Sequence, residues 1–525
     1  MGALDPYSGT WDEHHASHLL RRASFVTSRA KITEVSKMSI AAAVDMLLAD
    51  KPAPAEPTDP GLSTTPWNVN LTTPHPEDFK YRPYIKDWWL NLLLQPNNVS
   101  AIEKLTLFWS NHFSTESDVI NDSRFIYHLN ALTRKYAMGN VRDMVKQITI
   151  NTGMLRYLNG DSNTNNKPNE NYARELQELF TIGKGKEIAP GDYTNYTEDD
   201  IKAAARVLTG WRTNRNGDPS KSVFQLATHD TKDKQFSKAY NNKVIKGTNT
   251  AAGGLDEMNQ LVDMIFEQEE TARYIIRKVY RWFVFYTIDD DTEKNVIQPL
   301  ATMLRQNNFE IKPVLRTLFM SQVFFDTQNI AAMIKSPIDF LIGMANHFNF
   351  PLPTDTLQRV AALEKVWQLG AALQQNLMDP PSVAGWPAYY QEPGYYQQWI
   401  NSVTLPTRYG LTDIIVAGGG GRYLPPGWGL DVLAYPETVS ADVSNAMTLI
   451  ADIGTDLMPA YTLTTEEVEY IAKNVLMGGG QVYEWTTIWN DYKASPTNTA
   501  KKRAAQDRLT ATLKFMFRMA EYQLM

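Results

Sequence analysis

Apolar residues recur at helical spacing along almost the whole chain, and this periodicity constrains the fold more than any other feature. An apolar residue at every third or fourth position gives a helix one buried face, whereas strands need alternation, which is rare here. The pattern predicts helices over residues 17–22, 40–48, 84–94, 99–113, 122–137, 172–182, 198–209, 255–267, 271–287, 292–306, 311–320, 336–348, 356–373, 439–457, 465–475 and 500–522. We therefore expect a mainly α protein: a single large helical body over residues 1–525, with long irregular loops and at most a minor β-hairpin.

Two stretches interrupt the helical pattern. Residues 51–76 contain prolines at positions 52, 54, 57, 60, 66, 74 and 76, which exclude regular helix or central strand. We expect this proline-rich segment to be a long loop of the same domain, either packed across the body or mobile as a flap. Residues 224–246 favour a short β-hairpin or an irregular excursion, with Asn241 and Asn242 as its turn.

Composition excludes several functional classes. Hydrophobic residues make up 43% of the chain and charged residues 21%, values typical of a soluble globular protein with a sizeable core. The net charge of -7 argues against nucleic-acid binding, which needs a concentrated basic face. No apolar run approaches the ~20 residues of a membrane span. Because cysteine is absent, any metal must be bound by histidine, carboxylate or amide groups.

One predicted helix carries polar side chains on a single side. At 100° per residue these side chains fall in a sector about 100° wide, while the apolar residues point elsewhere. The members of this stripe are Asn171, Arg174, Glu175 and Glu178. The stripe is either the wall of a polar site or an ion-pair network, in which Arg174 or Arg206 neutralises the two glutamates.

His112 lies on the apolar face of its predicted helix, in line with Leu105 and Trp109. A buried imidazole needs a partner for at least one ring nitrogen. The residue is therefore either a structural histidine bonded to a carbonyl or carboxylate, or a metal ligand or general base. The two interpretations are about equally favoured.

A second polar group, made of His229, Asp230 and Lys234, falls in a predicted loop. Ligand-binding and catalytic side chains concentrate on loops held by a rigid scaffold, so a functional role is slightly favoured. The alternative is a turn in which Asp230 bonds its own backbone. In either case Lys234 could neutralise an anion.

His18 and Arg22 lie near the start of the chain, with Arg21 between them. His14 and His18 are four residues apart, close enough on a helix to chelate a metal, but the two arginines disfavour a bound cation. We expect either anion recognition or structural pairing to acids, and we favour the pairing.

Aromatic residues crowd positions 386–399, beginning with Trp386 and including Tyr389, Tyr390 and Trp399. Such a cluster can stack on sugar rings. More often it is a proline-braced cap over a core, with the polar tips hydrogen-bonded, and we favour that interpretation.

These segments stand in an order that resembles a known bacterial family, the domain of unknown function 1800. The resemblance is carried by HLLRR (18–22), FWSNHF (108–113), PNENYARELQELFTIG (168–183), YTEDD (196–200), ARVLTGW (205–211), HD (229–230) with Lys234, IKSP (334–337), PPSVAGWP (380–387) and EYQL (521–524). It spans the chain from about Trp11 to Met525. Members often have a further histidine where this chain has Ser110, so a role that needs two imidazoles there is not expected.

The family is named for having no established activity, so the resemblance implies membership and not a reaction. Members usually carry an export signal, which implies a periplasmic or secreted protein. The first five residues here lack the basic and apolar regions of a signal peptide, and we expect a mature sequence. Family genes often neighbour a sulfatase-like family, which implies a sulfatase-like partner protein.

Two functional hypotheses follow. The first is a metal-dependent enzyme, with a zinc, manganese or iron ion in a helical cleft. Its metal ligands would be His112, Glu175, Glu178 and His229, and Asp230 would join them in catalysis. The residues expected to bind substrate are His18, Arg22, Asn171, Arg174, Arg206, Lys234 and Trp386. The alternative is a non-catalytic glycan- or protein-binding component of a cell-envelope system.

Overall fold

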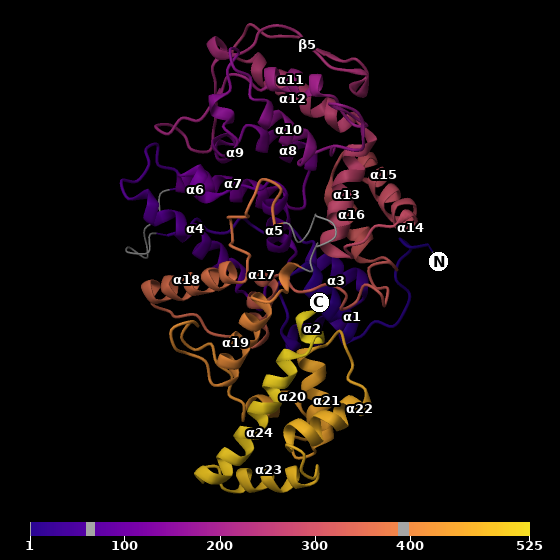
Figure 1. The fold of residues 1–525 in the computed structure, drawn as a ribbon, viewed down its shortest axis with the longest axis vertical. Coiled ribbons are helices and arrows are strands. Elements are labelled where there is room, and N and C mark those ends of the chain that lie inside the picture. The colour runs from indigo at the N-terminus through magenta and orange to yellow at the C-terminus, as the bar shows by residue number, and fades with distance from the viewer. Residues whose placement is uncertain (1, 59–68, 387–397) are drawn as a thin grey trace.

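Helices dominate the computed structural model, which describes residues 2–58, 69–386 and 398–525 (Figure 1). The first part of the chain forms α1 (Glu13–Ala23), α2 (Arg29–Ser36), α3 (Ile40–Leu47), α4 (Asp78–Leu93), α5 (Ile102–His112), α6 (Ser117–Ile120), α7 (Ser123–Lys135), α8 (Val141–Thr149), α9 (Thr152–Tyr157), α10 (Glu170–Glu178) and α11 (Glu198–Val207). The middle forms α12 (Gly253–Glu267), α13 (Glu269–Phe283), α14 (Asp290–Thr292), α15 (Gln298–Gln306), α16 (Ile311–Phe319), α17 (Pro337–His347) and α18 (Thr356–Ala372). The last part forms α19 (Thr404–Val416), α20 (Tyr435–Val439), α21 (Ala446–Leu457), α22 (Thr465–Tyr470), α23 (Glu484–Ala494), α24 (Thr499–Arg518) and the short 3-10 helix η8 (Glu521–Gln523). The predicted mainly α fold is confirmed.

Within the described residues the strands are short and form three separate antiparallel pairs. These are β1 (Glu187–Ala189) with β2 (Asp192–Tyr193), β3 (Trp211–Arg212) with β4 (Val223–Phe224), and β5 (Lys234–Gln235) with β6 (Val244–Ile245). The third pair is the hairpin expected within residues 224–246. Asn241 and Asn242 both take a φ of 55° in its connection, a left-handed conformation that asparagine tolerates better than most residues.

Local sequence explains where α11 begins. The Thr197 hydroxyl accepts from the backbone N–H of Asp200, and the Asp200 carboxylate accepts from the backbone N–H of Thr197. This capping box satisfies two backbone donors that the first turn leaves unpaired. Glu198 and Asp199 add negative charge at the positive end of the helix dipole.

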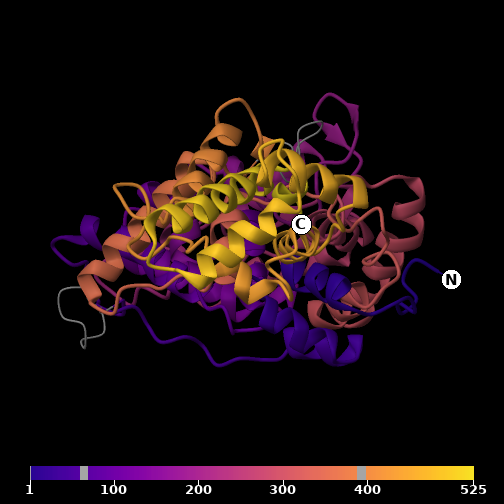
Figure 2. The same cartoon turned by 90° about the horizontal axis from the view of Figure 1, so that it is seen from below.

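The helices are arranged along the long axis of the molecule. In Figure 1, α8–α12 and β5 lie at one end, α20–α24 lie at the other, and α1, α3, α5, α16 and α17 lie between them. Seen from below in Figure 2, the C-terminal helices are in front of the rest of the chain. One cluster of buried apolar side chains extends from Ala16 in α1 to Tyr522 in η8. Distant parts of the sequence therefore share this core.

The described part of the proline-rich segment packs against the body. The Trp88 indole N–H in α4 donates to the carbonyl of Ala55 over 2.9 Å, and Pro57 is buried. Beyond the undescribed residues 59–68, the carbonyl of Val69 contacts His128 Nε2 at 3.2 Å. In the described ranges, no helix combines the length and apolarity that a membrane crossing requires.

Candidate functional site

The polar stripe of α10 is linked to α11 by its arginine. Arg174 Nη1 and Nη2 donate to Glu198 Oε1 and Oε2, each over 2.6 Å. The ion-pair interpretation expected Glu175 or Glu178 as the partner of Arg174. The ion pair instead goes to the first turn of α11, so Glu175 and Glu178 are not neutralised by this contact.

Glu175 and Glu178 form a half-buried carboxylate pair on α10. The hydroxyl of Tyr196 donates to Glu178 Oε2 over 2.9 Å. Burial raises the pKa of Glu175, and the neighbouring Glu178 charge raises it further. Asn171, two turns before Glu178, is exposed. A carboxyl group with a raised pKa beside a second carboxylate can carry a proton in acid–base chemistry.

His112 lies in an aromatic environment at the end of α5. Its Nε2 donates to the carbonyl of Phe180 over 3.0 Å. The rings around it are those of Phe108, Trp109, Phe113 and Phe180. Burial holds the pKa of His112 well below its usual value, so the imidazole is neutral. A bond to a backbone carbonyl is the contact expected of a structural histidine.

The same end of α10 binds two further donors from α13. The Leu179 carbonyl accepts from the Tyr274 hydroxyl and from Lys278 Nζ, each over 3.0 Å. Burial lowers the pKa of Lys278 to about 7, and the nearby Arg281 charge contributes. These contacts satisfy carbonyl groups that a helix C-terminus leaves unpaired. His112, Tyr274 and Lys278 therefore together hold the C-terminal end of α10 in place.

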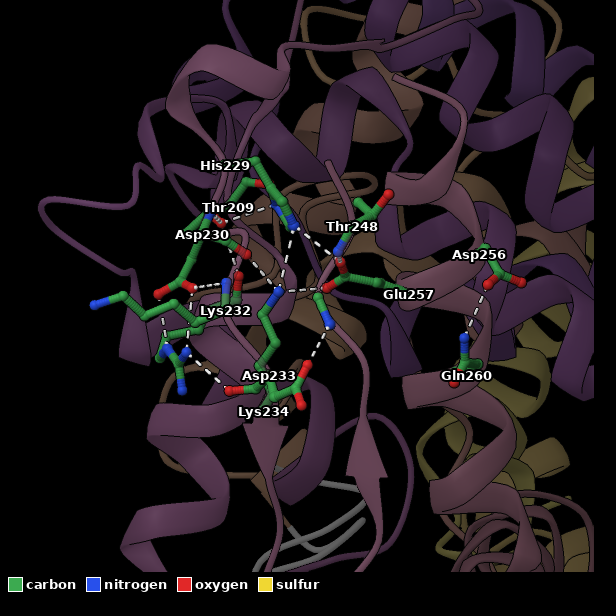
Figure 3. Close-up of polar contacts among 12 residues, drawn as sticks. Thr209, His229, Asp230, Lys232, Asp233, Lys234, Thr248, Asp256, Glu257 and Gln260 are labelled. Atoms are coloured by element: carbon green, nitrogen blue, oxygen red, sulfur yellow. Dashed lines mark hydrogen bonds and ion pairs between the residues drawn. The ribbon is translucent and has the colours of Figure 1, made fainter. Parts of the chain in front are cut away.

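His229 lies in a separate buried network, shown in Figure 3. Its Nδ1 is 2.9 Å from the Thr209 carbonyl, and its Nε2 is 3.2 Å from Glu257 Oε1. Glu257 Oε2 accepts from Lys234 Nζ over 2.5 Å. The backbone N–H of Thr248 donates to Glu257 Oε1 over 2.5 Å. The His229, Lys234 and Glu257 side chains are at most 2% exposed, so this group joins the hairpin to α12 and is closed to solvent.

Asp230 lies at the edge of that network. Arg206 Nε donates to Asp230 Oδ2 over 2.7 Å, and Arg206 Nη2 donates to Asp230 Oδ1 over 3.1 Å. The backbone N–H of Lys232 also donates to Asp230 Oδ1 over 2.9 Å, as the turn interpretation expects. Arg206 Nη2 further donates to the carbonyl of Asp233 over 3.0 Å. Arg206 thus anchors the loop that precedes β5 onto α11.

Sequence reasoning did not single out Glu257, which completes the network around His229. The signal was present, because Glu257 shares a helix face with the buried residues Leu261 and Met264. A carboxylate on an apolar face must find a buried partner.

The N-terminal motif makes backbone contacts. His18 Nε2 is 3.0 Å from the Phe324 carbonyl, and Arg22 Nη2 donates to the Asn329 carbonyl over 2.8 Å. Both side chains are buried. The favoured interpretation was structural pairing to acids, whereas the acceptors in these two contacts are backbone carbonyl oxygens.

Trp386 is buried, with 2% exposure. Its backbone N–H donates to Asn111 Oδ1 over 2.8 Å. Gly385 precedes it with a φ of 88°, and a Cβ there would lie 2.3 Å from Asn111 Oδ1, so only glycine fits. Trp386 and Trp399 are both buried, but Trp386 Nε1 lacks the expected hydrogen bond among the described residues. Tyr389 and Tyr390 lie outside the described residues.

The four predicted metal ligands do not form one centre. Across the part of the chain that the structure describes, no three histidine, aspartate or glutamate side chains form a group that could hold a metal ion. His112 binds a carbonyl, His229 binds Glu257, and Glu175 and Glu178 share the surface of α10. Metal binding stays a prediction.

A cavity of about 860 Å³ lies beneath the proline-rich segment and was not predicted. Its walls come from α4, α5, α7 and α16. They include Asp50, Lys51, Pro52, Ala53, Pro54, Trp88, Leu92, Ile102, Glu103, Tyr127, Arg134, Lys135, Lys312 and Arg316. A cavity between helices distant in sequence leaves no one-dimensional pattern.

Paired aromatic and charged groups shape this cavity. The rings of Trp88 and Tyr127 have centroids 5.4 Å apart at 63°. The Arg134 guanidinium lies 4.9 Å from the Trp88 ring, and Arg134 Nε donates to Glu103 Oε1 over 2.8 Å. Lys135 is exposed at the rim. The cavity thus offers an aromatic wall and an exposed cation to a ligand.

Comparison with known protein families gives a match over nearly the whole chain. The family model described as "Protein of unknown function (DUF1800)" matches residues 18–524. No curated protein and no solved structure matches the chain. The matched range includes α10, the His229 network and the cavity. The chain therefore belongs to the DUF1800 family.

Proposed function

We propose that this protein is a non-catalytic glycan-binding protein whose ligand occupies the cavity beneath the proline-rich segment. The observation that carries the proposal is a cavity of about 860 Å³ with an aromatic pair in its wall. Ligand sites in proteins commonly measure about 300–1,000 Å³ and combine apolar walls with a few polar groups.

The aromatic pair supports a ligand built of rings. Trp88 is half-buried, and its indole N–H is bonded to the Ala55 carbonyl, so the ring is held in place. A fixed indole is a low-entropy surface on which a sugar ring can stack. Trp386, the residue first considered for this role, is buried against Asn111.

The rim charges support an acidic glycan. Lys51 and Lys135 are exposed at the cavity. Arg134 and Lys312 are engaged by Glu103 and Asp50, at 2.8 Å and 2.9 Å. Exposed ammonium groups attract carboxylate or sulfate substituents without the cost of breaking an existing ion pair.

The expected export of the protein supports a glycan as the ligand. A periplasmic or secreted protein meets the glycans of the cell envelope, and a sulfatase-like partner would act on sulfated ones. Both points rest on the family resemblance.

Binding can be tested with the intact protein and a panel of neutral, uronate-containing and sulfated oligosaccharides. We expect acidic members to raise the melting temperature and to change tryptophan fluorescence. Trp88→Ala should lose both responses. Trp367→Ala is the matched control, because Trp367 is also half-buried but lies on α18, outside the cavity lining. A panel without any response, or equal responses from both variants, would overturn the proposal.

A second candidate is an enzyme centred on the carboxylate pair of α10. It is favoured by one observation: Arg174 pairs with Glu198 and leaves Glu175 and Glu178 available, with the pKa of Glu175 raised. Metal analysis tests its metal-dependent form, using protein purified without chelator or affinity-column metal. Near-stoichiometric zinc, manganese or iron that is lost in Glu178→Gln at an unchanged melting temperature would support it. Protein that contains no metal and does not bind added zinc, manganese or iron would overturn the metal-dependent form of this candidate.

A further inference from the structure

Three family-like segments meet around a small space near the C-terminal end of the chain. The backbone N–H of Lys335 donates to the Gln523 carbonyl over 2.8 Å, and Ile334 forms a bridge with Leu524. Arg21 of α1 also lines this space, and Figure 1 shows α1 beside the position marked C. The space measures about 20 Å³, and its lining includes Arg21, Lys335, Asp339 and Tyr522.

Arg21 lines this space with a guanidinium group that is only partly hydrogen-bonded within the described residues. Its side chain is buried, with 9% of the residue exposed. Its Nε donates to the Ser17 hydroxyl over 3.0 Å. Among the described residues, neither Nη group has an acceptor and no carboxylate forms an ion pair with the guanidinium. A buried guanidinium normally satisfies its five N–H groups.

Lys335 adds a second buried cation, with 7% exposure. Its Nζ donates to the Tyr522 carbonyl and lies 4.2 Å from the Tyr522 ring centroid. In the described part of the chain, no carboxylate forms an ion pair with it. Arg408 Nη2 donates to the Lys335 carbonyl over 2.8 Å and brings more positive charge nearby.

The carboxylate on the cavity wall is already engaged elsewhere. Asp339 binds the Lys104 ammonium and accepts from the Ser336 hydroxyl over 2.9 Å. Asp456, whose charge also acts on Arg21, is engaged by His347 Nε2 over 2.9 Å and by the Tyr435 hydroxyl over 2.7 Å. Arg21, and Lys335 when it is protonated, therefore have no carboxylate within ion-pair distance among the described residues. Buried charges are costly unless they are paired, so the arrangement calls for a counter-charge.

We infer that this space is a binding site for a small inorganic anion, chloride, held by the Arg21 guanidinium and the Lys335 ammonium. The volume of about 20 Å³ is large enough for a particle of the size of a water molecule or a halide ion. The site joins α1, α17 and η8, so the ion has a structural role. It is separate from the cavity proposed for glycans.

Burial, with the Arg21 and Arg408 charges, holds the pKa of Lys335 well below its usual value. A bound anion would favour the charged ammonium and raise that pKa. The competing arrangement is a neutral lysine beside a water molecule. The two arrangements differ in whether halide density occupies the space.

Bromide replaces chloride and gives an anomalous X-ray signal, so the wild-type protein crystallised with bromide tests the site without any substitution. We expect an anomalous peak within hydrogen-bond distance of Arg21 Nη and Lys335 Nζ. An ordered water there without an anomalous peak would overturn the inference.

Thermal unfolding gives an independent test. At constant ionic strength, replacing gluconate by chloride should raise the melting temperature by about 1–3 °C. The melting temperature of Arg21→Gln should not depend on chloride. If Arg21→Gln does not fold, Lys335→Met is used as the test variant in its place. Arg503→Gln, with a side chain 79% exposed, is the control that should keep it. Equal melting temperatures in the two salts, or stabilisation by sulfate alone, would contradict a chloride site.

Discussion

Arg174 and Glu198 form a bidentate ion pair, with both nitrogen–oxygen distances at 2.6 Å, and this pair joins α10 to α11. Glu198 also belongs to the first turn of α11, where its charge favours the helix dipole. One carboxylate thus serves both a helix end and a contact between two helices. Because Arg174 binds Glu198, it does not form an ion pair with Glu175 or Glu178.

The first prediction concerns this ion pair. Arg174→Lys should lower the free energy of unfolding by about 1 kcal/mol, because lysine cannot reproduce the two parallel bonds. The side chains are about one-third exposed, at 30% and 32%, so solvent limits the effect. Urea unfolding measures it. Lys202→Met, which removes the exposed contact to Asp199, is the control and should change stability less.

The second prediction concerns pH. Because the folded protein raises the pKa of Glu175, the ionised group opposes folding, and stability falls as pH rises from its unfolded value of about 4.5 through the folded pKa. Glu175→Gln should therefore raise the melting temperature at pH 7, and the gain should vanish as pH falls toward 4. Glu469→Gln, an exposed helical position, should show no such gain. If Glu175→Gln still melts at a higher temperature than the wild type at pH 4, ionisation of Glu175 is not the cause of the difference.

The third prediction concerns the buried network of Figure 3. Glu257→Gln should lower the free energy of unfolding by about 3–5 kcal/mol, because it leaves the Lys234 ammonium buried without its carboxylate. Lys246→Met removes an ion pair from the same hairpin, with a lysine side chain that is 78% exposed, and should cost less than about 1 kcal/mol. Chemical denaturation measures both variants. If Glu257→Gln and Lys246→Met lower the free energy of unfolding by similar amounts, burial of the ion pair does not determine its contribution to stability.

The fourth prediction concerns His112. His112→Ala removes a buried ring and leaves the Phe180 carbonyl without its donor, so the loss should be about 3 kcal/mol or more. Calorimetry measures the drop, and metal content is determined on the same samples. An unchanged melting temperature with a loss of bound metal would instead make His112 part of a metal site.

Much of the fold could be predicted, because helical periodicity and capping act within a few residues. The start of α11 at Thr197 and the turn at Asn241 are local, and both are found. Helix boundaries, and one whole helix, were not predicted correctly where the local sequence signal is weak. The helix expected over 84–94 begins at Asp78 despite Pro83, and the one expected over 439–457 begins only at Ala446, as α21. Residues 404–416, now α19, have no clear apolar stripe and were not predicted.

Individual polar residues were easier to select than their partners. The residue types at Arg174, His112 and His229 indicated that each needs a buried or charged contact, and each has one. Their partners lie 24, 68 and 28 residues away. Those pairings are set by helix packing, which a single sequence does not encode as a repeat. For the same reason, the wall of the large cavity was not foreseen.

The contact between His18 and Phe324 has a consequence for synthesis. It closes α1 against a segment 306 residues later. At about 5–20 residues per second, the ribosome needs roughly 15–60 s to deliver that segment. During this interval α1 can pack against the neighbouring α2 but not against the segment around Phe324. We therefore expect α1 to complete its native packing only after the middle of the protein has emerged.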